Sequence, residues 1–189
     1  SYNLATVNLG LDVGLGPVAK TYVQLGLDEA PPKYASILLG TAQLNPVEVA
    51  QMYNTLANGG FRSPLRAVRA VIDEQGKALK APELEVTEAA PAEAVYTLNR
   101  MLIEVFERGT ARPAKKALPP GLVVAGKTGT SNDYRDSWFA GFSGGHVIVV
   151  WMGHDDNATT GLTGTTGALQ AWTRLMAASS TTSFDPLMP

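Results

Sequence analysis

The chain has 189 residues, a formal net charge of -2 and no cysteine. This length suits one domain or a large part of one. The missing cysteines exclude disulfides, thiolate metal sites and a cysteine nucleophile. The charge balance lacks the basic excess of a nucleic-acid-binding protein, so no nucleic-acid partner is expected. The apolar runs are far shorter than the ~20 residues of a membrane span.

The first part of the chain predicts helices that are separated by breaks. Residues 4–27 mix small and apolar side chains, which predicts one or two short helices that end near Gly26. Asn45 and Glu48, with a proline between them at the first helical position, form a capping-box pattern that predicts the start of another helix. An Asn-Gly-Gly run at 58–60 predicts its end.

The middle of the chain predicts two strands, a turn and a further helix. Residues 65–72 show partial alternation and predict a strand, 73–76 predict a turn, and 77–79 predict a short return strand. A helix is expected to begin after Pro91 and to end near residue 108. Residues 111–120 carry three basic side chains and two adjacent prolines, and we interpret them as a solvated loop rather than a binding patch.

The last part of the chain predicts three consecutive strands, 122–130, 137–142 and 146–152. A Ser-Gly-Gly run joins the last two tightly, so they should form an antiparallel hairpin. A helix is expected over 168–178, after a loop rich in glycine and threonine. Because the helices lie mostly before and after a block of antiparallel strands, the pattern favours an α+β fold.

One short stretch fits two incompatible patterns. Residues 121–128 match the phosphate-loop pattern G-x-x-x-x-G-K-[ST], and Lys127-Thr128-Gly129 matches the K-T-G of enzymes that acylate a serine. A phosphate loop needs a helix that begins at the Lys-Thr pair. Here residues 122–125 are apolar and β-prone, and a glycine follows the pair. We therefore interpret the stretch as an edge strand, and the nucleotide-binding match as accidental.

The side chains of this predicted edge strand suit an anionic ligand. Lys127 offers a positive charge and hydrogen-bond donors, and Thr128 and Thr130 offer hydroxyl groups suited to a carboxylate. Gly129 has no side chain, so a ligand could lie against the backbone there. The stretch is thus a candidate substrate-binding strand.

Several motifs together resemble one family of acyl-transfer enzymes. Ser1-Tyr2-Asn3 is an S-x-N element, and the K-T-G element follows it in the right order. The more specific runs are 45–50, 59–60, 64, 127–133 and 136–141. From the first residue to about residue 175, the sequence resembles the transpeptidase domain of class A penicillin-binding proteins, in particular the bifunctional 1B type of Gram-negative bacteria.

The resemblance implies an α+β fold of the penicillin-binding protein and serine β-lactamase-like type, an antiparallel sheet flanked by helices. Residues 1–178 are expected to be the C-terminal part of the transpeptidase domain, and 179–189 a loose tail. The family's nucleophile lies in an S-x-x-K element before S-x-N, and no serine of this sequence has a lysine three residues later. We therefore expect the nucleophile in an N-terminal remainder, either upstream in the same polypeptide or in a separate chain.

The same resemblance implies a reaction and a set of roles. The upstream serine would attack a stem peptide that ends in D-alanyl-D-alanine, and an amine of a neighbouring chain would take the acyl group. Ser1 would relay a proton, Asn3 would bind the substrate amide, and Lys127 would support both Ser1 and the substrate carboxylate. The run 128–130 (Thr-Gly-Thr) would bind substrate, and the Thr130 N–H would form half of an oxyanion hole. Which group is the general base stays open.

The implied partners are peptidoglycan stem peptides, β-lactams and the N-terminal remainder. The parent protein is expected to be membrane-anchored and to carry a glycosyltransferase as well, with this segment soluble at the periplasmic face of the bacterial inner membrane. No cofactor or metal is implied, and we interpret His154-Asp155-Asp156 as a surface turn rather than metal ligands. Two alternatives stay open: a serine β-lactamase-type hydrolase and a non-catalytic penicillin-sensing or scaffold domain.

Overall fold

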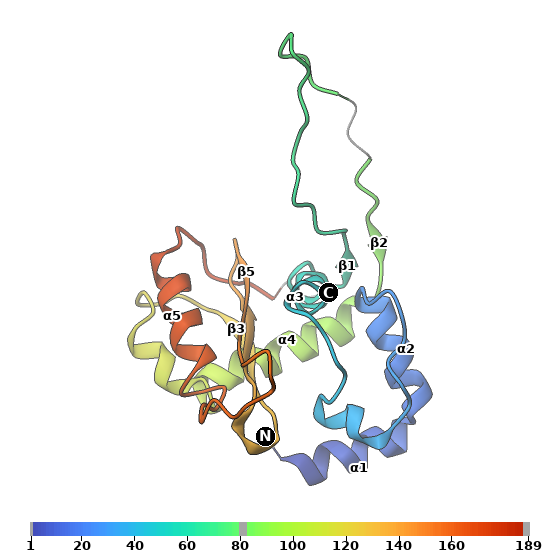
Figure 1. The fold of residues 1–189 in the computed structure, drawn as a ribbon, viewed down its shortest axis with the longest axis vertical. Helices are drawn as coiled ribbons and strands as arrows, with labels where there is room; N and C mark the ends of the chain where they lie inside the picture. The colour runs from blue at the N-terminus through green and yellow to red at the C-terminus, as the bar shows by residue number, and fades with distance from the viewer. Residues whose placement is uncertain (1, 80–82, 187–189) are drawn as a thin grey trace.

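A computed structural model describes residues 2–79 and 83–186 (Figure 1). Over these residues, helices pack around a three-stranded antiparallel sheet, with a separate two-stranded ladder beside it. The larger sheet has the order β3-β4-β5, formed by Ala125–Thr130, Ser137–Phe142 and Val147–Met152. The predicted α+β class is confirmed.

Three helices before the sheet begin and end where their local signals predict. They are α1 (Asn3–Val13), α2 (Leu15–Leu25) and α3 (Pro46–Ala57), whereas the 3-10 helix η1 (Ala35–Leu39) was not predicted. Gly26 ends α2 with a φ of 126°, which glycine adopts at no steric cost. The Asn45 side chain accepts hydrogen bonds from the N–H groups of Val47 and Glu48, and the Glu48 carboxylate accepts from the Asn45 N–H, so the capping box is confirmed. None of the described helices is long and apolar enough to cross a membrane.

The three predicted strands pair in consecutive antiparallel order, and the last two form the predicted hairpin. Lys127 pairs with Ala140, and Gly129 pairs with Trp138. The Ser143 N–H donates to the His146 carbonyl, which closes the predicted turn between β4 and β5. The first strand begins at Ala125 rather than at the predicted residue 122, because the backbone of residue 123 bonds to the C-terminal segment instead of to β4.

Aromatic side chains hold helices against one face of this sheet. Phe106 of α4 (Ala92–Glu107), Phe139 of β4 and Trp172 of α5 (Ala168–Ala178) form a three-ring cluster, with centroids 4.8 to 5.7 Å apart. These rings are at most 2% exposed. Burying rings of this size contributes strongly to stability. A second cluster, around Phe142, packs on the other face against α3 and α4.

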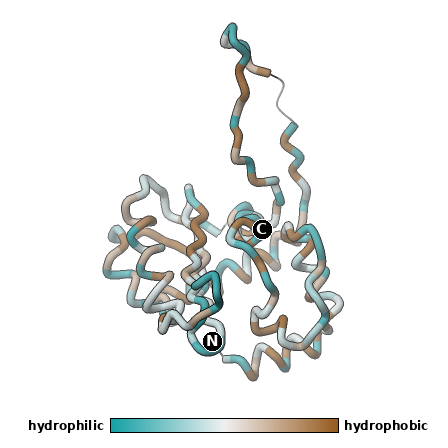
Figure 2. The backbone as a smooth tube through the Cα atoms, viewed as in Figure 1, coloured by the Kyte–Doolittle hydropathy of each residue, from teal (hydrophilic) through white to brown (hydrophobic). Residues whose placement is uncertain are grey.

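The strand predicted over 65–72 is not formed. Apart from one bridge between Ile72 and Ala78, the only ladder among the described residues of this region pairs β1 (Phe61–Arg62) with β2 (Thr87–Glu88). The turn at 73–76 is confirmed, because the Gly76 N–H donates to the Asp73 carbonyl at 3.0 Å. Residues 61–79 and 83–88, which we call the arm, project from the body (Figure 1). The arm contains several hydrophobic residues (Figure 2), and their side chains are exposed.

Two segments that were predicted to be a solvated loop and a loose tail pack against the body through apolar side chains. Residues 111–120 contain the 3-10 helix η2 (Arg112–Lys116), and the apolar residues around its basic side chains, Ala111, Ala114 and Leu118, are buried. The C-terminal segment after 178 also docks onto the body. Phe184 is 7% exposed, lies 4.7 Å from the Phe142 ring, and donates its N–H to the Val123 carbonyl. The loose-tail prediction is therefore wrong as far as residue 186, since one aromatic anchor fixes the segment.

Candidate active site

The K-T-G motif lies on β3, the outer strand of the larger sheet. Among the described residues, β3 pairs only with β4, so its other side is the edge of the sheet. The strand continues to Thr130 and is followed by the short 3-10 helix η3 (Asn132–Tyr134). No helix begins at Lys127, so the local structure that a phosphate loop requires is not present. The predicted edge strand is confirmed.

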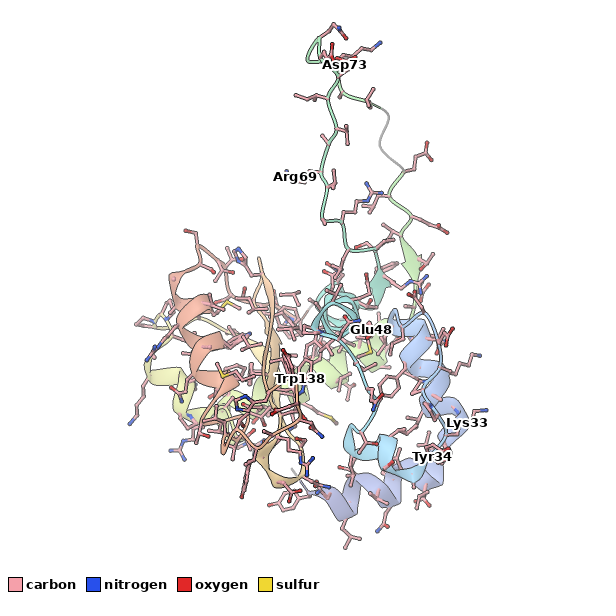
Figure 3. The ribbon with its side chains drawn as sticks, viewed as in Figure 1. Lys33, Tyr34, Glu48, Arg69, Asp73 and Trp138 are labelled. Carbon is pink, nitrogen blue, oxygen red and sulfur yellow. The ribbon has the colours of Figure 1, made fainter. Side chains whose placement is uncertain are left out.

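Neighbouring side chains of β3 alternate between the two faces of the sheet. Lys127 and Gly129 share one face with Trp138, and Thr128 and Thr130 lie on the face of the three-ring cluster. A Cβ atom at Gly129 would lie 3.1 Å from the Trp138 Cβ, which is a tight contact. Trp138 is half-buried beside Trp151 and is labelled in Figure 3.

Lys127 is held close to the backbone of its own strand. Its Nζ donates to the Thr128 carbonyl at 3.0 Å and lies 3.5 Å from the Thr128 hydroxyl. The side chain is half-buried, and this burial lowers the pKa of Lys127, because leaving water disfavours the charged ammonium group. A charge in such partly dehydrated surroundings interacts more strongly with a bound anion than it would in bulk water.

Two loops outside the motif orient its threonine hydroxyls. The Thr128 Oγ1 and Thr110 Oγ1 atoms share a hydrogen bond of 2.7 Å, and the Thr165 hydroxyl donates to the Thr110 carbonyl. The Thr130 Oγ1 accepts from the Gly164 N–H at 2.8 Å. The edge strand is therefore supported by the turn after α4 and by the loop before α5.

The loop before α5 fits the sheet so closely that one position requires glycine. A Cβ atom at Gly164 would lie 2.6 Å from the Gly129 carbonyl oxygen and 2.8 Å from that of Trp138. The buried Ser137 hydroxyl ties the same loop to β4, since it donates to the Thr163 carbonyl and accepts from the Ala168 N–H. Sequence reasoning missed these supports, because composition marks residues 158–167 as a loop without saying what they contact.

The predicted site residues fall into two groups. The structure brings Lys127, Thr128, Gly129 and Thr130 together on β3. Asn3 is exposed in the first turn of α1, a helix whose contacts are with α2 and η1. Ser1 lies outside the described residues. The roles predicted for these six residues stay predictions.

Two other features lie near the sheet. Phe139 is fully buried in the three-ring cluster and therefore belongs to the core. His154, Asp155 and Asp156 are exposed in a turn after β5, which is closed by a bond from the Asn157 N–H to the His154 carbonyl. Among the described residues, no three His, Cys, Asp or Glu side chains gather as metal ligands would.

Comparison with known proteins gives one consistent result. Residues 1–172 match the model of the penicillin binding protein transpeptidase domain family. The chain is 42% identical over 191 aligned positions to penicillin-binding protein 1B of Escherichia coli, which covers 100% of this chain and 22% of that protein. It is 40% identical over 173 positions to penicillin-binding protein 1B of Haemophilus influenzae, which covers 91% of this chain and again 22% of the relative. The chain thus spans about a fifth of the length of these relatives.

Two solved structures illustrate the shared fold. Penicillin-binding protein 1A from Haemophilus influenzae superposes with a TM-score of 0.87 at 20% identity, over 99% of this chain and 34% of that one. The PonA1 protein from Mycobacterium tuberculosis, solved in complex with penicillin V, superposes with a TM-score of 0.72 at 22% identity, over 91% of this chain and 51% of that one.

Proposed function

Because this chain belongs to the penicillin-binding protein transpeptidase domain family, we propose that the protein containing it cross-links peptidoglycan as a D,D-transpeptidase and is a target of β-lactams. The observation that carries the proposal is the edge strand β3, which presents a half-buried lysine and two oriented threonines within a family match over residues 1–172. The relatives are much longer than this chain, so the activity belongs to the whole protein.

The reaction we infer is a two-step acyl transfer. A serine outside residues 1–189 attacks the carbonyl carbon between the last two residues of a D-alanyl-D-alanine stem peptide. The C–N bond breaks, and D-alanine leaves with the serine proton. An amine of a second stem peptide then attacks the ester, forms the cross-link and releases the serine. Splitting the exchange into two steps is the usual advantage of covalent catalysis.

Residues of this chain bind and polarise the donor peptide in the proposed reaction. Lys127 and the hydroxyls of Thr128 and Thr130 hold its terminal carboxylate, and Gly129 lets its backbone lie against β3. The Thr130 N–H donates to the carbonyl oxygen as negative charge develops there, one half of an oxyanion hole. Ser1 relays a proton to the leaving amine, and Asn3 binds the amide of the donor peptide. These roles follow the family motifs at matching positions.

A β-lactam follows the same first step. Its strained amide acylates the same serine. The released amine stays attached to the opened ring instead of leaving, so the acyl-enzyme persists. The penicillin V complex of PonA1, a protein of the same fold, supports this ligand class. We further infer that the remainder of the protein completes the site, carries a glycosyltransferase, and anchors the domain to the membrane at the periplasmic face of the inner membrane.

Labelling and turnover of the full-length protein test this proposal. Purified protein should form a covalent adduct with fluorescent penicillin that persists for many minutes, and should release D-alanine from a D-alanyl-D-alanine peptide when an acceptor amine is present. Rapid hydrolysis of the penicillin would favour the serine β-lactamase alternative. A stable adduct without any peptide turnover would favour the penicillin-sensing alternative.

A further inference from the structure

A pocket outside the K-T-G motif is separated from the proposed site by the side chain of Thr110. It has a volume of about 820 Å³ and is formed by the end of α4, the following turn, η2 and Thr165. Thr110 lines this pocket and also shares the 2.7 Å hydrogen bond with the Thr128 hydroxyl. A ligand whose carboxylate contacts Thr128 therefore has the pocket beside it.

The lining of this pocket is strongly basic. Arg108, Arg112, Lys115 and Lys116 line it with a single acid, Glu107. The Lys115 Nζ atom lies 2.6 Å from Glu107 Oε2, and Arg108 forms an ion pair with Glu104 on the neighbouring turn of α4. Within the described residues, Arg112 and Lys116 have no acidic partner. The pocket thus keeps two cations available in a chain whose net charge is -2.

Stabilisation of the helix end is a competing explanation for this charge. Cations near the C-terminus of a helix interact favourably with its dipole, and Arg108 and Lys115 also form ion pairs with acids of α4. Arg112 and Lys116 lie beyond that helix, at the two ends of η2. Their exposed side chains border an open pocket, where they can reach an anion without being stripped of water. Their position therefore suits ligand binding better than helix capping.

We propose that this pocket is a subsite for a second anionic group on the leaving-group side of the donor, so that, of two donors of the same shape, the one with an additional carboxylate next to its terminal carboxylate reacts faster. The proposal rests on the proposed transpeptidase function, because it places the terminal carboxylate at Thr128. The subsite recognises a carboxylate through Arg112 and Lys116, and Thr110 forms the wall between it and the K-T-G strand. Exposed ion pairs are weak, so the preference is about three- to tenfold for two cations.

A matched pair of donors tests the proposal in the full-length protein. One peptide ends in D-alanyl-D-glutamate and the other in D-alanyl-D-glutamine, which have nearly the same shape and differ by one charge. The measured quantity is the ratio of kcat/KM for release of the last residue from the two peptides. The wild-type ratio should favour glutamate about three- to tenfold, and the double variant Arg112→Gln, Lys116→Gln should bring it close to one. Raising the ionic strength should lower the wild-type ratio as well.

A second double variant controls for the overall charge. Arg69→Gln with Lys33→Gln also removes one arginine and one lysine, at the exposed positions labelled in Figure 3, away from the pocket lining. It should keep the wild-type ratio. A ratio near one in the wild type, or an equal loss in both double variants, would overturn the subsite. If the pocket variant lowers the melting temperature but keeps the ratio, the cations serve the helix end, and the proposal is wrong.

The outcome also separates the subsite from the reaction itself. If the wild type forms the fluorescent-penicillin adduct and releases both residues without a charge preference, the subsite fails and the transpeptidase proposal stands. If it forms no adduct and releases neither residue, the proposed function fails first. If it forms the adduct and releases D-alanine but neither of the two larger residues, the subsite is overturned and the proposed function stands. Should the double variant not fold, Arg112→Gln alone, expected to lower the ratio about twofold or more, still decides the point.

Discussion

The larger sheet and the arm contain β-prone sequence of similar character, yet only one of them forms a complete ladder. Strands β3 to β5 pair along their whole length, and Phe139 and Phe142 are fully buried between the sheet and its helices. In the arm, Val68 and Ile72 are 64% and 65% exposed, and the described residues form one isolated bridge beyond the two-residue ladder of β1 and β2 at its base. Strand propensity produces a sheet here only where one face is covered, as expected from its dependence on context.

Removing a ring from the three-ring cluster should have the largest effect on stability. Trp172 is fully buried against Phe106 and Phe139, so Trp172→Ala leaves a large cavity and should cost about 4 to 5 kcal/mol. Chemical denaturation of the complete transpeptidase domain measures this loss. Trp138→Ala, at a half-buried position, is the matched control and should cost clearly less. Equal losses would mean that the cluster is not the centre of the core.

The C-terminal segment offers an intermediate test, because one aromatic ring fixes it. Phe184→Ala removes the edge-to-face contact with Phe142 and should cost about 3 kcal/mol. The Val123 N–H donates a hydrogen bond to the Ser183 hydroxyl, and this N–H should then exchange faster in hydrogen-exchange measurements. Phe61→Ala, an exposed ring at the base of the arm, should leave stability nearly unchanged. An unaffected domain after Phe184→Ala would show that the segment is not anchored.

The buried lysine should produce a smaller, pH-dependent effect. Burial lowers the pKa of Lys127 below its ordinary 10.5 in the folded state, so the unfolded chain holds this proton more tightly. The free energy of unfolding should therefore rise with pH between the lowered pKa and 10.5, and Lys127→Met should remove that rise. Subtracting the variant's curve of unfolding free energy against pH from that of the wild type isolates the contribution of Lys127. The contributions of Tyr22 and Tyr53, whose pKa values are raised by burial, then cancel. A variant curve with an unchanged slope would contradict this account.

The smallest effect is expected on the arm. Val68→Ser removes an apolar side chain that touches little of the body, so the free energy of unfolding should change by less than about 0.5 kcal/mol. Val95→Ser in α4, where the side chain is 2% exposed, is the matched control and should destabilise the domain strongly. A large loss from Val68→Ser in the full-length protein would show that another part of that protein covers the arm.

Local signals in the sequence predicted most of the fold. The capping box at Asn45 and the glycine after α2 need no distant partner, so these boundaries could be predicted. The failures depended on tertiary contacts instead. Whether residues 65–72 pair, and whether Phe184 docks, is decided by what lies across from them in space, which no short pattern contains.

The candidate site shows the same division. The K-T-G strand could be predicted because its residues are adjacent in sequence and its β-prone flank sets the local structure. The hydrogen bonds that support this strand could not be predicted, because Thr110 and Gly164 lie 18 and 34 residues away from their partners in the sequence. Ordinary loop composition gives no sign of these two hydrogen bonds.

Mapping the serine that a β-lactam acylates, in the full-length protein and its Lys127 variants, tests the central claim most directly. The account predicts a single adduct at a serine outside residues 1–189, detected by mass spectrometry. It also predicts an acylation rate reduced about a hundredfold or more in Lys127→Ala and unchanged in Lys33→Ala. An adduct on any serine of this chain, or a Lys127→Ala variant acylated as fast as wild type, would contradict it.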